Sequence, residues 1–295
     1  MKKFLTKIAL YTFFILLIGN GIAYLSLYVL GKSQLYKNQF VKNGVKETHF
    51  DYVVLGSSTG LTTLDSKLID KTLNTSGLNI SMDDTSLSSH HLMLQYFLSL
   101  GKTTDQLILC VTPGDLQNPV NELNNNDYRF LTEVQDTLVY NYYDKMEKQG
   151  LKILAYSRYL PLLGVSYYNS ELFYPSLYAF FTPNKRNRFD DKGNYTYPEI
   201  ANNIEKKSNV TSKTSFANPS FIKIKKLCKE IGIDLIVYQS PIHSTNVVFP
   251  NTNEFKIINH ANILPEELFY DDIHVNSKGR IFCTLAFCKE FKTQP

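Results

Sequence analysis

A serine near one end of the chain, and an aspartate and a histidine near the other, have the residue types that nucleophilic catalysis requires. Ser58 lies in a small-residue turn at 56–60, and Asp271 lies three residues before His274. A serine hydroxyl is a weak nucleophile near neutral pH, so it needs a base within hydrogen-bond reach and a carboxylate that holds the tautomer of that base. The spacing of Asp271 and His274 lets the carboxylate reach Nδ1 while Nε2 faces a serine from another strand.

Other interpretations of these residues compete with this hypothesis. His243 also follows an expected strand and is the main rival base. Taken alone, either histidine is more often a structural residue, and a Gly-Ser-Ser-Thr-Gly stretch after a strand is more often a plain loop. A phosphate-binding loop is disfavoured, because the turn lacks the Gly-Lys-Ser/Thr ending of such loops.

The elements that must position these residues follow a repeating strand-turn-helix pattern. Apolar runs predict strands at Tyr52–Leu55, Leu78–Ser81, Gln106–Val111, Ile233–Tyr238 and, more weakly, Phe255–Asn259. Helices are expected at Ser66–Leu73, Leu87–Leu98, Pro219–Ile231 and after Gly279. The pattern predicts an α/β fold with a parallel sheet and crossover helices. Ligands bind at the carboxyl edge of such sheets, which is the edge that Ser58 follows.

The pattern lapses from about residue 117 to 216, where the chain is rich in asparagine and tyrosine. We expect an inserted lobe of helices and long loops there, with an exposed turn at 188–195. Its aromatic rings could stack on sugars, although packing in the core of the lobe is the favoured interpretation. The rings in question are those of Tyr140, Tyr142, Tyr143, Tyr167, Tyr168, Tyr174 and Tyr178.

The N-terminal run Ile8–Leu30 carries no charge and is long enough to cross a hydrocarbon core of roughly 30 Å as a helix. Lysines in the first seven residues precede it, which favours a cytoplasmic N-terminus and export of the rest of the chain. A cleaved signal peptide is the alternative, but the run exceeds a usual signal core and no small-x-small site follows it closely. We therefore expect a single-pass membrane protein with a cytoplasmic tip and transmembrane anchor at 1–31 and a tether at 32–50.

Composition and charge limit the function classes. The 295 residues are 43% hydrophobic and 20% charged, which is ordinary for a globular protein. Most of the formal net charge of +4 comes from the lysines before the anchor, so the exported part has too little positive charge to suggest a nucleic-acid partner. The basic stretch 185–188 is interpreted as a solvated loop. The cysteines, Cys110, Cys228, Cys283 and Cys288, lack the spacing of a zinc site. They are expected to be buried thiols, although an exported location also allows a disulfide.

Two motifs together resemble those of the SGNH (GDSL-like) hydrolase superfamily. They are Val-Val-Leu-Gly-Ser-Ser at 53–58 and Phe-Tyr-Asp-Asp-Ile-His-Val-Asn-Ser-Lys-Gly at 269–279. The closer resemblance is to its membrane-anchored, exported branch, which includes proteins acting in alginate acetylation and teichoic-acid D-alanylation. The resemblance implies a flavodoxin-like three-layer parallel sheet over residues 51–295, interrupted by the inserted lobe. It also implies a catalytic triad of Ser58, Asp271 and His274.

The sequence departs from this family at the oxyanion hole. The family usually supplies hydrogen-bond donors from a glycine after strand two and an asparagine after strand three. Here the corresponding stretches are residues 80–85 and 112–115, and neither residue is in place. The remaining candidates are main-chain N–H groups of Ser58 and of Asp83 or Asp84, whose carboxylates would oppose an oxyanion unless they turn away. Loss of one such donor typically lowers the rate by about 10²–10³.

We therefore expect an exported, membrane-tethered esterase or O-acyltransferase that acts on acyl esters of a cell-envelope or secreted polysaccharide through an acyl-serine. No metal or diffusible cofactor is needed. The expected partners are the envelope polymer, the membrane and a membrane-bound acyl donor protein. The alternative is a non-catalytic binding or scaffold protein of an envelope-polymer modification complex, which the missing oxyanion residues favour. A peptidase that uses Ser58 is a third hypothesis.

Overall fold

The structure is a computed structural model that describes residues 1–117, 122–148, 150–199, 204 and 208–291. The chain divides into two compact units. The first comprises Met1–Val45 and Asp127–Asn187, and the second comprises Lys46–Asn126 and Arg188–Pro295. The N-terminal segment and the middle of the chain therefore belong to one unit, and the predicted triad belongs to the other.

The second unit is built on a sheet of five parallel strands in the order β2-β1-β3-β5-β7. The strands are β1 (His49–Leu55), β2 (Gly77–Asn79), β3 (Thr103–Val111), β5 (Asp234–Gln239) and β7 (Lys256–Asn259). Each lies at or within a few residues of an expected strand, so the α/β class and the parallel sheet are confirmed. The register pairs Leu55 with Leu109 and Val111 with Gln239, which places the carboxyl ends of β1, β3 and β5 at one edge.

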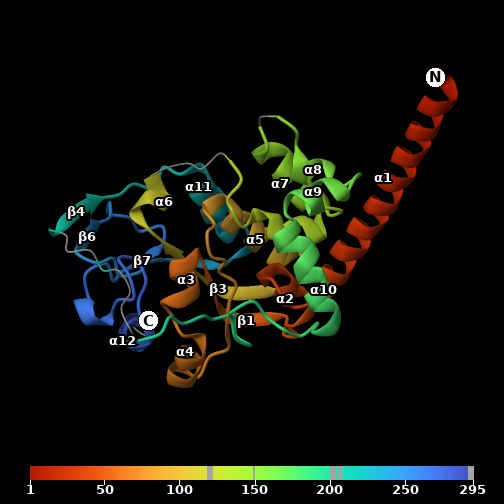
Figure 1. The fold of residues 1–295 in the computed structure, drawn as a ribbon. Helices are drawn as coiled ribbons and strands as arrows, with labels where there is room; N and C mark the ends of the chain where they lie inside the picture. The colour runs from red at the N-terminus through yellow and green to blue at the C-terminus, as the bar shows by residue number, and fades with distance from the viewer. Residues whose placement is uncertain (118–121, 149, 200–203, 205–207, 292–295) are drawn as a thin grey trace. The chain divides into compact units, whose positions relative to one another are not determined.

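Helices cover both faces of this sheet because its strands are apolar on both sides. One face packs with α4 (Ser66–Leu73) and α12 (Ser277–Phe291) in a core that contains Tyr52, Ile108, Tyr238 and Phe287. Helices α5 (Leu87–Ser99) and α11 (Pro219–Ile231) pack against each other, and α11 packs on β5. Figure 1 shows this pair on the opposite side of the strands from α4. The short helices are α3 (Ser58–Thr62), α6 (Pro113–Gln117) and η3 (Glu266–Leu268).

Capping residues set the limits of the helices as the sequence predicts. The Asn218 side chain accepts hydrogen bonds from the N–H groups of Ser220 and Phe221, and Gly232 ends α11 with φ +76°. Asp65 caps α4 in the same way. All four cysteines are buried free thiols, as expected.

Two features of the second unit differ from expectation. A separate pair of parallel strands, β4 (Val210–Lys213) and β6 (Thr245–Val248), has no strong sequence signal because both strands are short and mostly exposed. The exposed turn predicted at 188–195 is wrong, since Gly193 and Asn194 are buried. This segment covers the open edge of β2, where the N–H of Asn79 donates to the carbonyl oxygen of Lys192.

The first unit is helical. Its elements are α1 (Lys2–Gly31), α2 (Lys37–Asn43), η1 (Asp127–Glu133), α7 (Thr137–Met146), α8 (Ile153–Tyr156), α9 (Leu162–Tyr167), the π-helical turn η2 (Asn169–Phe173) and α10 (Tyr174–Phe181). Helix α1 is the one helix in the described part of the chain that is long and apolar enough to cross a membrane. Its C-terminal half packs against α9, α10, η1 and η2.

The first unit agrees only in part with the expected tether and with the expected burial of its tyrosines. Residues 33–41, in the expected tether, fold back into this unit, and Phe40 and Val41 of α2 are buried. Tyr143 is fully buried, as expected for a ring that fills the lobe. Tyr167, Tyr174 and Tyr178 are exposed instead.

Candidate active site

Ser58 is the first residue of α3, which follows β1 through a two-residue turn. Glycines make this turn possible because the backbone is pressed against its neighbours. A Cβ on Gly56 would lie 2.8 Å from Cβ of Cys110 and 2.9 Å from its carbonyl oxygen, and one on Gly60 would lie 2.7 Å from Oγ of Ser81. The turn therefore packs on β3 and on the segment after β2, which holds Ser58 at the carboxyl edge of the sheet.

His274 and Asp271 lie in a tight loop before α12. The Oδ1 atom of Asp271 accepts hydrogen bonds from the N–H groups of Ile273 and His274, at 3.0 and 2.9 Å. The N–H of Tyr270 donates to the carbonyl oxygen of His274 at 2.8 Å and closes the loop. These bonds fix the backbone on both sides of the imidazole.

The structure brings the three predicted triad residues together. Nε2 of His274 lies 2.8 Å from Oγ of Ser58, and Nδ1 of His274 lies 2.8 Å from Oδ2 of Asp271. A proton on Nδ1 donates to the carboxylate, and Nε2 is then free to accept the hydroxyl proton of Ser58. This is the hydrogen-bond order that an activated serine requires.

The remaining histidines of the second unit do not take this position among the described contacts. The ring of His243 is buried beside Phe269, and its main-chain N–H donates to the carbonyl oxygen of Asp272. Burial lowers the pKa of His90 to about 3 and also lowers the pKa of His260. The ring of His90 bonds to Thr85, and the ring of His260 bonds to Tyr238 and Glu290. His274 is therefore the histidine that bonds to Ser58 in the described structure.

The predicted oxyanion residues Asp83 and Asp84 lie beside the Ser58 turn. The N–H of Met82 donates to the carbonyl oxygen of Gly56 at 3.0 Å, which ties the two segments together. The carbonyl oxygen of Asp83 accepts from the side-chain amide of Asn126, and the carboxylate of Asp84 accepts from that of Asn125, both at 2.8 Å. The Asp84 carboxylate is therefore exposed and held by an amide, and its backbone has φ +54°.

The segment after β3 closes on itself. Oδ2 of Asp115 accepts from both the N–H and the hydroxyl of Thr112, each at 2.8 Å. Burial raises the pKa of the Asp115 carboxyl. The family's asparagine donor thus has no counterpart at 112–115, where a local turn occupies the end of the strand.

An aromatic pair that sequence reasoning missed lies over the imidazole. The ring centroid of Tyr197 is 5.0 Å from that of His274, and Tyr197 stacks on Tyr270. Burial, and then the nearby Asp271 carboxylate, raise the pKa of Tyr197. Tyr197 reaches the site because its backbone bridges to Asn276 in the loop of His274.

The sequence matches no known protein-family model, and no curated protein matches it either. A family assignment thus remains a proposal. The feature of the site that points to a function is the hydrogen bond between Ser58 and His274.

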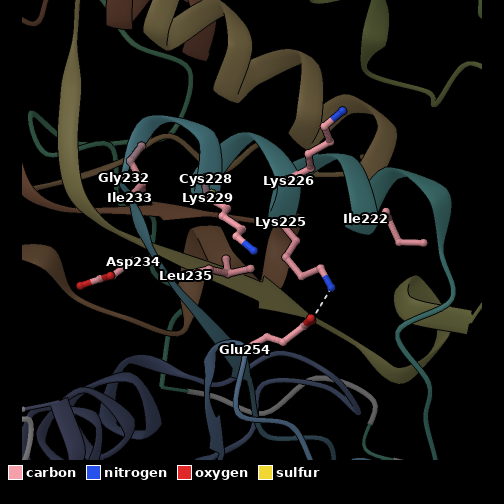
Figure 2. A pocket seen from close by; sticks show the side chains of 10 residues that line it. All are labelled: Ile222, Lys225, Lys226, Cys228, Lys229, Gly232, Ile233, Asp234, Leu235 and Glu254. Carbon is pink, nitrogen blue, oxygen red and sulfur yellow. Dashed lines mark hydrogen bonds and ion pairs between the residues drawn. The ribbon is translucent and has the colours of Figure 1, made fainter.

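A pocket of about 530 Å³ lies away from the triad. It is formed by α11 and the amino end of β5, whereas Ser58 lies at the carboxyl edge of the sheet. Figure 2 shows Lys225 extended toward Glu254, with which it forms an ion pair. Asp234 adds a second carboxylate to the lining, so the positive charge of the lysines is partly balanced. Size alone does not make this pocket the active site.

One group of side chains in the described residues has the types that hold a metal ion. His49, Asp51 and Asp105 bring ligand atoms within 4.8 Å of one another near the amino ends of β1 and β3. Asp51 accepts a hydrogen bond from the N–H of Ser76, and the His49 ring bonds to Thr103. Partly exposed groups with protein partners of this kind are common without an ion, and they lie at the opposite ends of the strands from Ser58.

Proposed function

We propose that this chain is an SGNH-like serine esterase or O-acyltransferase that acts on acyl esters of a cell-envelope or secreted polysaccharide. The observation that carries the proposal is the 2.8 Å contact between Oγ of Ser58 and Nε2 of His274, with Asp271 on the other side of the ring. The order of the elements supports the same class, since the serine follows the first strand and the Asp-x-x-His loop precedes the last helix.

The reaction proceeds in two balanced steps. Oγ of Ser58 attacks the ester carbonyl carbon while Nε2 of His274 takes the hydroxyl proton. The bond from the carbonyl carbon to the leaving oxygen then breaks, and His274 gives its proton to that oxygen, which leaves an acyl-serine. In the second step water or a sugar hydroxyl gives its proton to His274 and attacks the carbonyl carbon of the acyl-serine. The bond from that carbon to Oγ of Ser58 then breaks, and His274 returns the proton to Oγ. Asp271 stabilises the imidazolium in both steps.

Main-chain groups are the proposed oxyanion donors. The first N–H groups of a helix lack intrahelical acceptors, so the N–H of Ser58 at the start of α3 is suited to this role. The N–H groups of Asp83 or Asp84 are the proposed second donor. The amide of Asn125 holds the Asp84 carboxylate, which supports a position turned away from the developing charge.

The site is proposed to work outside the cytoplasm on a membrane anchor. The support is α1, which has the length and apolar composition of a transmembrane helix, and the lysines that precede its apolar span. A tethered enzyme near the lipid suits a polymer that emerges at the membrane or a membrane-bound acyl donor.

A fluorescent organophosphonate and a chromogenic acetate ester test the proposal on the full-length chain in detergent. We expect the phosphonate to label Ser58, and Ser58→Ala to abolish both labelling and ester turnover. Ser57→Ala is the matched control, because Ser57 is next to Ser58 but takes no part in the hydrogen bonds of the triad. Its Oγ lies 3.4 Å from Oγ1 of Thr59. Turnover that survives Ser58→Ala in folded protein contradicts the proposed nucleophile.

A non-catalytic scaffold is the second candidate function. It is favoured by the closed turn at 112–115 and by the acidic residues where the family has a glycine. The two proposals differ in one measurement: a scaffold that binds the polymer remains unlabelled by the phosphonate, even though Ser58 and His274 are within hydrogen-bond distance.

A further inference from the structure

Helix α10 has its small side chains buried and its large apolar side chains exposed. Ser176 and Ala179 are buried, whereas Leu177, Phe180 and Phe181 are 49%, 68% and 80% exposed. In water the opposite arrangement is favoured, because large apolar side chains gain the most free energy from burial. Small residues at helix contacts with large apolar residues facing outward are typical of helices in lipid.

Large apolar side chains are also exposed before and at the end of α9, in the same unit. Tyr159 and Leu160 precede α9, Tyr167 ends it, and all three are exposed. We define the α9–α10 surface as Tyr159, Leu160, Tyr167, Leu177, Phe180 and Phe181. Exposed large apolar side chains concentrated in one unit of a protein indicate an interaction surface.

The contacts of Leu162 with α1 place the beginning of α9 at membrane depth. The N–H of Leu162 donates to Oδ1 of Asn20 at 3.1 Å, and the Leu162 side chain lies 3.3 Å from the position of a Cβ on Gly19. With a rise of 1.5 Å per residue, Asn20 lies about 18 Å along the helix from Ile8. A hydrocarbon core of about 30 Å that begins near Ile8 therefore extends well past the contact with Leu162.

The polar atoms at this contact are also arranged as lipid requires. Asn20 is the one strongly polar side chain within Ile8–Leu30, and its amide oxygen bonds to a backbone donor of α9. An unpaired amide in hydrocarbon would be costly, so this bond suits a helix contact inside the bilayer. Further along α1, Ala23, Leu27 and Leu30 are buried, while residues 2–18 are exposed.

We propose that the α9–α10 surface is embedded in the membrane leaflet that the C-terminal half of α1 crosses, with lipid acyl chains as its occupant. The first unit is then a membrane-embedded lobe in addition to a single-helix anchor. This inference rests on the proposed membrane crossing of α1, but it does not depend on the orientation of the chain or on ester chemistry.

Depth-dependent fluorescence quenching tests the proposal on the full chain in phosphatidylcholine vesicles. Bimane is attached to single cysteines introduced as Leu177→Cys and Phe181→Cys, with Ile15→Cys reporting the α1 crossing and Lys145→Cys as an exposed control on α7 of the same unit. The native cysteines are buried, so a folded variant reacts at the introduced thiol alone and an unfolded one is recognised by its extra labels.

We expect nitroxide on the lipid chains to quench the probes at 15, 177 and 181, and iodide in the buffer to quench the probe at 145. If iodide quenches the probes at 177 and 181 while the lipid nitroxide quenches the probe at 15, the inference is overturned but α1 still crosses the membrane. Lack of lipid quenching at 15 overturns the membrane crossing itself. Shielding of 177 and 181 from both quenchers, dependent on the protein-to-lipid ratio, assigns the surface to a second copy of the chain and also overturns the inference. Phosphonate labelling of Ser58, measured on the same samples, reports the proposed enzyme activity separately.

Discussion

Tyr197 and Tyr270 lie face to face, with ring centroids 4.2 Å apart and planes inclined by 13°. Tyr270 belongs to the loop of Asp271 and His274, whereas Tyr197 comes from the segment that follows the first unit in sequence. The two rings form an aromatic surface beside the imidazole. A sugar ring of the proposed substrate could pack on this surface without itself contacting Ser58.

Removal of the Tyr197 ring should therefore affect a polymer more than a small ester. We expect Tyr197→Ala to raise KM for an acylated oligosaccharide about 10-fold and to leave kcat/KM for a small acetate ester within about 3-fold, because a lost stacking contact costs on the order of 1 kcal/mol. Tyr197→Phe, which keeps the ring, is the matched control. Equal losses on both substrates would show that Tyr197 supports the loop of His274 rather than the substrate.

The sequence predicts the strands and capped helices well because their signals are local. The run at 106–111 is apolar enough to be a strand in any setting, and Asn218 and Gly232 mark the limits of α11 through their own hydrogen bonds and backbone geometry. Ser58 and His274 could be paired before the structure because each lies in a recognisable motif, although they are 216 residues apart.

The place of Tyr197 could not be predicted in this way. It depends on the segment that covers the edge of β2, which is held by Asn194 accepting from Ser66 and by the N–H of Tyr195 donating to Leu61. Those bonds join residues far apart in sequence and leave no periodic pattern. The burial of α2 also could not be predicted from local signals. Its polar residue Asn38 is buried and donates a hydrogen bond to the carbonyl oxygen of Arg129, which is distant in sequence.

Asp271 is expected to act through the imidazole. Asp271→Asn should lower kcat for ester turnover by about 10²–10⁴-fold, because an amide favours the wrong tautomer of His274 and does not stabilise the imidazolium. His243→Gln is the control, since the His243 side chain lies outside the hydrogen bonds of Ser58 among the described contacts. A larger loss of kcat in His243→Gln than in Asp271→Asn would indicate that His243 is the base.

Gly56 sets the position of the turn that carries Ser58. A Cβ there meets the backbone oxygen of Cys110 at 2.9 Å, which no side-chain rotation relieves. We expect Gly56→Ala to destabilise the fold by about 1–3 kcal/mol and to lower ester turnover at least 10-fold at temperatures where the chain stays folded. The matched control is Gly114→Ala, whose added Cβ lies 3.9 Å from the Thr112 hydroxyl. Equal thermal unfolding temperatures and equal ester turnover in Gly56→Ala and Gly114→Ala would contradict this prediction.

Asn276 joins the loop of Asp271 and His274 to the last helix through both ends of its amide. Oδ1 accepts from the N–H groups of Lys278 and Gly279, and Nδ2 donates to the carbonyl oxygen of Glu267 at 2.9 Å. Asn276→Asp keeps the cap of α12 and loses the donor, whereas Asn276→Ala loses both. We expect both variants to lose ester turnover, and Asn276→Ala to lose about 1 kcal/mol more stability. Unchanged turnover in both would show that the loop of His274 holds its shape without this amide.

His90 makes the second unit sensitive to acid. Burial lowers its pKa from 6.5 to about 3, so the unfolded chain binds a proton between these values that the folded chain does not. Stability therefore rises with pH through this window and falls as pH drops below about 6.5. The loss from His90 alone between pH 7 and pH 5 is about 2 kcal/mol, and His260, whose pKa is also lowered by burial, adds to it.

Chemical denaturation of the detergent-solubilised chain at pH 7 and pH 5 measures this effect. His90→Gln removes the titrating group and keeps a polar atom near Thr85, the partner of the imidazole. We expect the variant to be less stable than the parent at pH 7 because packing is disturbed, but to lose less stability on going to pH 5. An equal loss of stability from pH 7 to pH 5 in the parent and in His90→Gln would show that groups other than His90 cause the acid sensitivity. His49→Gln is the control, because it replaces an exposed histidine rather than a buried one.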